Sequence, residues 1–271
     1  MENNEYIFQP QVSVDPLLRA FVIENALAGY NYPPHWHENM EFLYCVSGTG
    51  TLRYNGKIYT MQPGDLIAVN TEVFHHLYSE EPMYFHCLIP DRRFCKASGI
   101  PTSELRFQEQ LSDPTAVSAF LQIFEAYDQF KQSGNTYDVA PFHARTLDFL
   151  HLLCKNYRVS TSNSLPPHRN ELVKSTMVYI EQHLTQPMTL DAIAAHVGVD
   201  KYHLTKEFKR VIGRTIFDTI LMLRCAEAKR LLQSGTSVAQ AARTCGFENM
   251  SYFTRAFKKY QNVLPSRCVK K

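Results

Sequence analysis

Two stretches in the last third of the chain repeat one pattern, TLDAIAAHVGVDKYHLTKEFKRVIG at residues 189–213 and SVAQAARTCGFENMSYFTRAFKKYQN at residues 237–262. Each stretch holds a short run of regularly spaced apolar residues, then a glycine, then a longer basic run. In the first stretch the apolar residues recur at the spacing of one helical face, and Gly198 stands where that helix would end. That face comprises Leu190, Ile193, Ala194 and Val197. The pattern therefore predicts a short helix, a turn and a second helix, in two copies.

The residues around the predicted turns favour the same structure in both copies. Asp200 and Asn249 can cap the second helix of each pair, and Ser237 with Gln240 forms a capping box for the first helix of the second copy. Two helices joined by a glycine turn form a helix-turn-helix, whose second helix enters the major groove of DNA. The inward-facing residues of the two second helices are Leu204, Phe208 and Ile212 in the first copy and Phe253, Phe257 and Tyr260 in the second.

The doubled unit, and above all GFENMSYFTRAFKKYQNVLP at residues 246–265, resembles the C-terminal domain of AraC-family transcription regulators. The resemblance covers Val173 to Pro265, and it implies a regulator that binds double-stranded operator DNA and is not an enzyme. The chain departs from the family pattern at its end, because Asn262 stands where glycine is usual, and Cys268 and Val269 where tyrosine and arginine are usual. Asparagine tolerates the left-handed conformation that a glycine would adopt there.

The polar sides of the two second helices are the expected DNA-binding surface. By family position, Tyr202, Thr205 and Lys206 are expected to meet bases. Arg255 is the strongest candidate for a base contact, because a guanidinium can pair two-fold with guanine, whereas Lys258 is expected to meet phosphate. For each residue the alternative is a solvated side chain without a DNA contact. The full set is Lys201, Tyr202, Thr205, Lys206, Lys209, Met250, Ser251, Arg255 and Lys258.

Charge is divided unevenly along the 271 residues, although the net charge is only +2. Up to Pro167 there are 11 basic and 18 acidic residues, a net charge of −7, whereas the remainder has 17 basic and 8 acidic residues, a net charge of +9. A basic half is typical of contact with nucleic acid, and an acidic half fits solubility or a small-molecule ligand. The length accommodates two domains, each with its own core.

The seven cysteines indicate reduced thiols in a cytoplasmic protein, because their number is odd and none has C-x-x-C spacing. The first residues, MENNEYIFQP, lack the basic and apolar regions of a secretion signal, and no run reaches 18 apolar residues. We therefore expect neither export nor a membrane span.

The first half is expected to be β-structure, which makes the whole chain a multidomain α+β protein. Short strand-like runs occur at residues 21–24, 40–46, 51–54, 57–61, 66–69 and 83–89, separated by Gly, Pro, Asn and Glu clusters. Asn55-Gly56 between two runs predicts a type I′ hairpin turn. Such spacing is typical of a sandwich or small barrel.

Gly29, His35, His37, Glu41 and Gly48 reproduce the first sequence motif of the cupin fold, and Pro63-Gly64-Asp65 with His75 resembles its second motif. His35, His37 and Glu41 are all odd-numbered, so on one strand they would project from the same face into the barrel. Three imidazoles and one carboxylate, His35, His37, His75 and Glu41, can hold a divalent transition metal ion with open positions. The alternative is that these side chains contact a ligand or pair with each other. We expect no required cofactor, with a divalent transition metal ion possible at this site.

A small-molecule effector is expected in this barrel, because aromatic and polar side chains surround the predicted cluster. Aromatic side chains suit the face of a sugar, so a carbohydrate is one class of effector; packing in the core is the alternative for each residue. The predicted effector-binding residues are His35, Trp36, His37, Glu41, Tyr44, Tyr54, His75 and His86.

Residues 103–157 show helical periodicity with a Ser-Gly-Asn turn at 133–135, which predicts a helix pair. By resemblance this pair forms a homodimer interface; packing within the chain is the alternative. The sequence thus divides into a cupin-like effector-sensing domain at 1–100, a helical hairpin at 101–157, a linker rich in Ser, Asn and Pro at 158–170, and a DNA-binding domain at 171–271.

Three functions remain open at this point. The favoured one is a ligand-responsive, sequence-specific transcription regulator. The others are a metal-dependent cupin enzyme joined to a DNA-binding domain, and a DNA-binding protein whose cupin domain is a dimerisation scaffold without a ligand.

Overall fold

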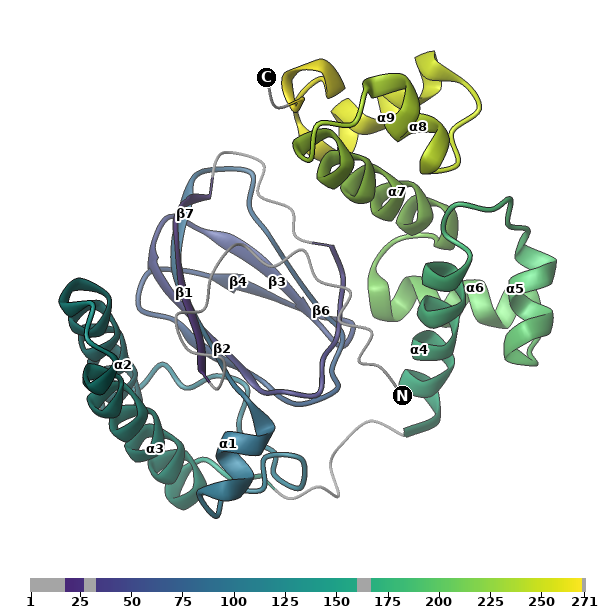
Figure 1. Cartoon of the computed structure of the whole chain (residues 1–271). Helices are drawn as coiled ribbons and strands as arrows, with labels where there is room; N and C mark the ends of the chain where they lie inside the picture. The colour runs from purple at the N-terminus through teal and green to yellow at the C-terminus, as the bar shows by residue number, and fades with distance from the viewer. Residues whose placement is uncertain (1–17, 27–32, 160–166, 270–271) are drawn as a thin grey trace. The chain divides into compact units, whose positions relative to one another are not determined.

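The computed structural model describes residues 18–26, 33–159 and 167–269. The chain divides into two units. We call the described residues from 18 to 159 the sensor unit and residues 167–269 the DNA-binding unit. Each unit has its own core, and together they give the predicted α+β architecture (Figure 1). No helix among the described residues is both long and apolar enough to cross a membrane. All seven cysteines are free thiols.

The sensor unit contains two antiparallel sheets. One has the strand order β1-β7-β2-β5 and the other β4-β3-β6. The strand β6, which contains His75, was missing from the predicted strands. The strands are β1 (Leu18–Ala26), β2 (Glu41–Ser47), β3 (Gly50–Tyr54), β4 (Lys57–Met61), β5 (Leu66–Val69), β6 (His75–Tyr78) and β7 (Met83–Pro90).

Asn55 and Gly56 join β3 to β4 as the sequence predicted. Both have positive φ angles, 48° and 81°, which a type I′ turn requires. The turn fixes the register in which Tyr54 pairs with Lys57 and Gly50 with Met61. The hairpin prediction is therefore confirmed.

Three strands of the larger sheet, β2, β5 and β7, divide their side chains between two cores. Leu43 and Cys45 of β2, together with Phe85 of β7, belong to the inner core between the two sheets. The alternating residues Phe42 and Leu88 face the other way, into a second core that they share with the helices. This alternation decides which polar side chains can meet inside the barrel.

The helix pair covers the outer face of the larger sheet (Figure 1). The short helix α1 (Arg92–Ala97) was not predicted; the pair itself is α2 (Pro114–Ser133) and α3 (Val139–Asn156), joined through Gly134 and the 3₁₀ turn η1 (Thr136–Asp138). Phe149 of α3 meets Phe42 edge to face, with 5.1 Å between ring centroids. The pair therefore completes the core of the sensor unit.

The first helix of the pair begins eleven residues later than Ser103, where the helical pattern was expected to begin. Asp113 supplies the reason, because its carboxylate accepts hydrogen bonds from the backbone N–H groups of Thr115 and Ala116 and so caps α2. Residues 104–111 instead run along the sheet, where Leu111 N–H donates to Leu66 O at 2.8 Å.

The DNA-binding unit is entirely helical. Its first helix begins at Pro167, so the predicted linker is shorter than 158–170 at its C-terminal end, and residues 160–166 lie outside the described residues. The helices are α4 (Pro167–Gln182), α5 (Leu190–Val197), α6 (Lys201–Ile212), α7 (Ile216–Gln233), α8 (Val238–Thr244) and α9 (Met250–Gln261), followed by the 3₁₀ turn η3 (Pro265–Arg267).

Both helix-turn-helix pairs form at the predicted positions. Thr189 and Asp200 cap α5 and α6, and Ser237 and Asn249 cap α8 and α9. Asn262 ends α9 with φ at +57°, so asparagine does adopt the left-handed conformation expected of it. Cys268 and Val269, the other departures from the family pattern, pack against the core formed by α7, α8 and α9.

Candidate effector site and DNA-binding interface

Four polar side chains predicted to form the cluster converge in the sensor unit. His37 Nε2 lies 2.8 Å from Glu41 Oε2, and His75 Nε2 lies 3.1 Å from the same oxygen. The rings of His35 and His75 are 4.0 Å apart, centroid to centroid. One nitrogen or oxygen from each of the four side chains can be chosen so that all lie within 4.8 Å of one another. We call His35, His37, Glu41 and His75 the histidine cluster.

The backbone positions the histidine cluster differently from the expectation of one continuous strand. Only Glu41 lies on β2, whereas His35 and His37 belong to the irregular segment before it. His35 N–H donates to His75 O at 3.1 Å, and His75 N–H donates to His35 O at 3.0 Å. The cluster therefore depends on a bridge between distant segments and not on alternation along β2 alone.

Backbone carbonyls hold the outer nitrogen of each imidazole. The Nδ1 atoms of His35, His37 and His75 lie 2.9, 2.8 and 3.0 Å from the carbonyl oxygens of Pro33, Asn39 and Val73. A carbonyl oxygen only accepts, so each Nδ1 must carry a proton. In the neutral imidazole Nε2 then presents a lone pair, and it is Nε2 of His37 and His75 that faces the carboxylate.

Burial and charge act together on the histidine cluster. Burial and the neighbouring His75 hold the pKa of His35 well below its ordinary value, so this imidazole is neutral at pH 7. Burial raises the pKa of Glu41, but His75 and His37 outweigh it, so the pKa of the Glu41 carboxyl lies well below its usual range. The Cys87 thiol donates to Glu41 Oε1 at 3.3 Å and helps to orient the carboxylate.

The other four predicted effector residues do not share one surface. Trp36 lies beside the cluster in sequence, with its ring 6.3 Å from that of Phe74. Tyr54 is buried in the inner core, where its hydroxyl accepts from Asn70 Nδ2 at 3.2 Å. Tyr44 and His86 point to the outer face of the sheet, toward α2, because both alternate with inward-facing residues.

His86 stacks on Phe124 of α2 with 4.2 Å between ring centroids, and Tyr44 lies 6.1 Å from Phe120. The expectation that Tyr44 and His86 line the barrel interior with the histidine cluster is therefore wrong in its geometry. Their place against α2 was available from the sequence, because residue 44 has opposite parity to Glu41 and residue 86 to Cys87.

The first DNA-reading helix, α6, has the predicted two faces. Leu204, Phe208 and Ile212 are buried, as expected, and Tyr202 is 77% exposed. The opposite face borders a concave surface of about 700 Å³. Its lining contains all five predicted residues of this helix together with three others: Lys201, Tyr202, Thr205, Lys206, Lys209, Leu190, Asp191 and Arg210.

Asp191 was not predicted, and it pairs with Lys201. The Lys201 ammonium group donates to Asp191 Oδ1 at 2.9 Å, and this hydrogen bond raises the pKa of the lysine. Arg210, also missed, is paired with Glu207 at 3.0 Å. Lys206 and Lys209 are exposed, which makes them the more available cations on α6.

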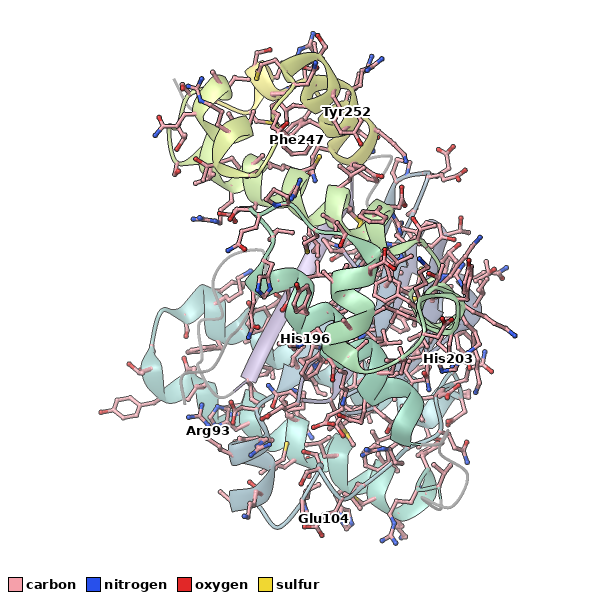
Figure 2. All side chains as sticks on the ribbon, turned by 90° about the vertical axis from the view of Figure 1, so that its right-hand side faces the viewer. Arg93, Glu104, His196, His203, Phe247 and Tyr252 are labelled. Carbon is pink, nitrogen blue, oxygen red and sulfur yellow. The ribbon has the colours of Figure 1, made fainter. Side chains whose placement is uncertain are left out.

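The second reading helix, α9, buries Phe253, Phe257 and Tyr260 as predicted. A second concave surface of about 440 Å³ is lined by Met250, Ser251, Thr254 and Arg255, of which only Thr254 was not predicted. Lys258 is exposed. Figure 2 labels Tyr252, in the first turn of this helix, and Phe247, in the turn before it; their rings lie 6.3 Å apart.

This arrangement, two helix-turn-helix pairs in one unit and a double-sheet unit with a polar cluster, defines a DNA-binding regulator with a ligand-binding domain. A family model described as an AraC-like ligand binding domain matches residues 19–140, and one described as a helix-turn-helix domain matches residues 193–271. The chain belongs to the AraC family of transcription regulators and is ligand-responsive.

Relatives agree with this assignment. The HTH-type transcriptional activator RhaS of Escherichia coli is 26% identical over 255 residues, which are 90% of this chain and 89% of RhaS. An uncharacterized HTH-type transcriptional regulator of Pseudoalteromonas carrageenovora is 36% identical over 98 residues, 36% of this chain and 58% of that protein. These relatives are transcription regulators, not enzymes.

A solved structure supports the fold. Apo ToxT from Vibrio cholerae, in a singly substituted form, superimposes with a TM-score of 0.52 at 18% identity, covering 93% of this chain and 97% of ToxT. At this identity the match concerns the fold alone.

Proposed function

We propose that the effector of this regulator is a small polar molecule that binds in the sensor unit beside the histidine cluster. The supporting observation is the convergence of three imidazoles and a carboxylate, of which His37 keeps 21% of its side chain exposed. Buried polar groups gathered around an accessible point are typical of ligand sites. Trp36, next to two members of the cluster, suits the face of a sugar, so a carbohydrate is the class we favour.

We expect the effector to stabilise the sensor unit. A ligand at a hundred times its Kd adds about 2.7 kcal/mol to the free energy of unfolding. In a thermal-shift screen of sugars and small metabolites, the responding compound should raise the melting temperature of the wild type, and His37→Ala should abolish the response. Tyr44→Phe, a change on the opposite face of the sheet, should retain it.

The same compound must also change the affinity for operator DNA, because a ligand shifts an equilibrium only by its different affinity for the two states. Two outcomes would favour a sensor unit that acts only as a scaffold. In one, no compound raises the melting temperature of the wild type; in the other, His37→Ala and Tyr44→Phe lose the response equally.

We also propose that the histidine cluster binds a divalent transition metal ion. Two Nε2 lone pairs directed at one carboxylate oxygen repel it unless positive charge lies among them. Protons on His37 and His75 are one source of that charge, and a metal ion is the other. A metal ion would also give the neutral His35 a role as a ligand. Protons on the other two histidines would give His35 no role.

The residues present fit such an ion. Metal–nitrogen and metal–oxygen bonds are about 2.0–2.2 Å, so ligand atoms on opposite sides of an ion lie about 4 Å apart. The maximum separation of 4.8 Å within the cluster is close to that value. Carbonyl groups that accept from Nδ1 orient metal-binding histidines in the same way. A bound ion would act as a Lewis acid toward an oxygen of the effector.

Metal analysis of untagged protein tests this proposal. After treatment with a chelator and incubation with Mn, Fe, Co, Ni or Zn salts, we expect close to one equivalent of metal per chain, and a raised melting temperature. His35→Ala should lose most of the metal, whereas His151→Ala, on the exposed face of α3, should not. Less than about a tenth of an equivalent of metal per wild-type chain would contradict the metal site. Protonated imidazoles would then be the source of positive charge beside Glu41.

The nine predicted DNA-binding residues remain our proposal for the interface with DNA. Arg255→Ala should weaken the free energy of binding to the operator by about 1–3 kcal/mol and relax specificity at one base position, because it removes the contact to that base. Lys258→Ala should weaken all sequences alike and reduce the dependence of affinity on salt. Competition binding against a library of single-base operator variants distinguishes the two roles. A uniform loss from Arg255→Ala would reassign it to phosphate.

We further propose a homodimer through the helix pair α2 and α3, in the cytoplasm, where the operators of bacterial regulators lie. Light scattering should give twice the 31.2 kDa mass of one chain. Leu152→Arg, at a half-exposed position of α3, should reduce the mass to that of one chain, because a charge is costly in an interface. Val178→Arg, at an exposed position of α4, should not. A mass of 31.2 kDa for the wild type at micromolar concentration would contradict the dimer.

A further inference from the structure

Arg224, in the middle of α7, makes three hydrogen bonds to backbone carbonyls of the DNA-binding unit. Its Nε donates to Leu184 O at 2.7 Å and its Nη2 to Gln186 O at 2.7 Å. Its Nη1 donates to Gly246 O at 3.0 Å. Leu184 and Gln186 lie in the loop from α4 to α5, which leads into the first helix-turn-helix, and Gly246 lies in the turn of the second. One guanidinium therefore joins the loop that leads into the first helix-turn-helix to the turn of the second.

Gly246 is fitted closely to this contact. Its φ of +76° is a conformation that residues with a side chain rarely adopt. A Cβ atom at this position would lie 2.9 Å from Thr185 O and 3.0 Å from Arg224 Cζ. The turn of the second pair thus approaches the entry loop of the first pair and the guanidinium more closely than any larger residue allows.

A second contact fixes the other end of α9 to α7. The Tyr260 hydroxyl donates to Asp218 Oδ1, and Lys259 Nζ donates to the same oxygen at 3.0 Å. Asp218 lies in the first turn of α7, more than one helical turn before Arg224. With its preceding turn held by Arg224 and its last turn by Asp218, α9 cannot rotate relative to α7 without breaking hydrogen bonds.

We infer that Arg224 is a positioning residue for DNA binding, which sets the distance and rotation between the two reading helices α6 and α9. It reaches no concave DNA-facing surface of either helix. The consequence for DNA is a preference for one spacing between the two major-groove contacts. An additional base pair lengthens that spacing by about 3.4 Å and rotates the second contact around the DNA axis. Two reading helices held at a fixed distance and rotation would then lose one of their two contacts.

The geometry requires arginine. The three acceptors come from two separate segments, and a planar guanidinium offers donors in three directions, whereas an ammonium group is a single point. Burial lowers the pKa of Arg224, but an arginine side chain stays protonated throughout the physiological range. Arg224→Lys therefore retains the positive charge and removes the planar set of donors that reaches all three carbonyls.

Spacing preference is the property to measure. An operator is first selected from random DNA with the full-length wild-type protein, and duplexes are then made with one base pair added or removed between the two footprinted contacts. We expect the wild type to lose about ten-fold or more in affinity on either change. Arg224→Lys, Arg224→Met and Gly246→Ala should bind the selected operator more weakly, with the penalty for altered spacing reduced to about three-fold or less.

Two controls separate positioning from other roles. Arg230→Met removes a cation from the same helix, where it pairs with Glu227 at 2.6 Å, and should leave the spacing penalty unchanged. The salt dependence of affinity should be the same in Arg224→Met and the wild type, because Arg224 does not contact phosphate; a decrease in this dependence would overturn the inference.

The inference also fails if any folded Arg224 variant keeps the full spacing penalty. Circular dichroism and thermal melting establish which variants are folded. If Arg224→Lys, Arg224→Met and Gly246→Ala are all unfolded while Arg230→Met is folded, Arg224 serves stability alone, and the positioning role is likewise overturned.

Discussion

A backbone carbonyl needs a hydrogen-bond donor, and this constraint organises both candidate functional regions. In the sensor unit, carbonyls of Pro33, Asn39 and Val73 each accept from a histidine Nδ1, and the opposite nitrogens of His37 and His75 turn toward Glu41. In the DNA-binding unit, carbonyls of three residues accept from Arg224. In both places a side chain satisfies the backbone, and in return the backbone fixes the direction of that side chain.

This constraint explains which parts of the structure could be predicted from sequence. The two helix-turn-helix pairs were accessible because caps, apolar period and turn glycine are all local signals, and Asn55-Gly56 fixed its hairpin for the same reason. The convergence of the histidine cluster was anticipated from spacing, although the contact between His35 and His75 that produces it joins residues forty positions apart.

Long-range contacts set the limit of that prediction. Nothing local marks Arg224, because its acceptors are carbonyls, which every residue provides. The strand β6 was missed because His75 and His76 obscure its apolar pattern, although both are buried. Tyr44 and His86 were a different failure, since strand alternation already assigned them to the face opposite Glu41 and Cys87.

The contacts of His37 indicate where an effector can act within the sensor unit. Its Nδ1 donates to Asn39 O, and Asn39 Oδ1 accepts from the backbone N–H of Arg92 at the start of α1, at 2.9 Å. Phe94 of α1 in turn meets the ring of His143 on α3 with 5.1 Å between centroids. A ligand that displaces His37 would therefore disturb Asn39, and with it a hydrogen bond to the first residue of a helix that packs on the helix pair. Regulation requires only that this displacement be more favourable in one arrangement of the pair than in another, because coupling is a difference in free energy between states and not a property of the path.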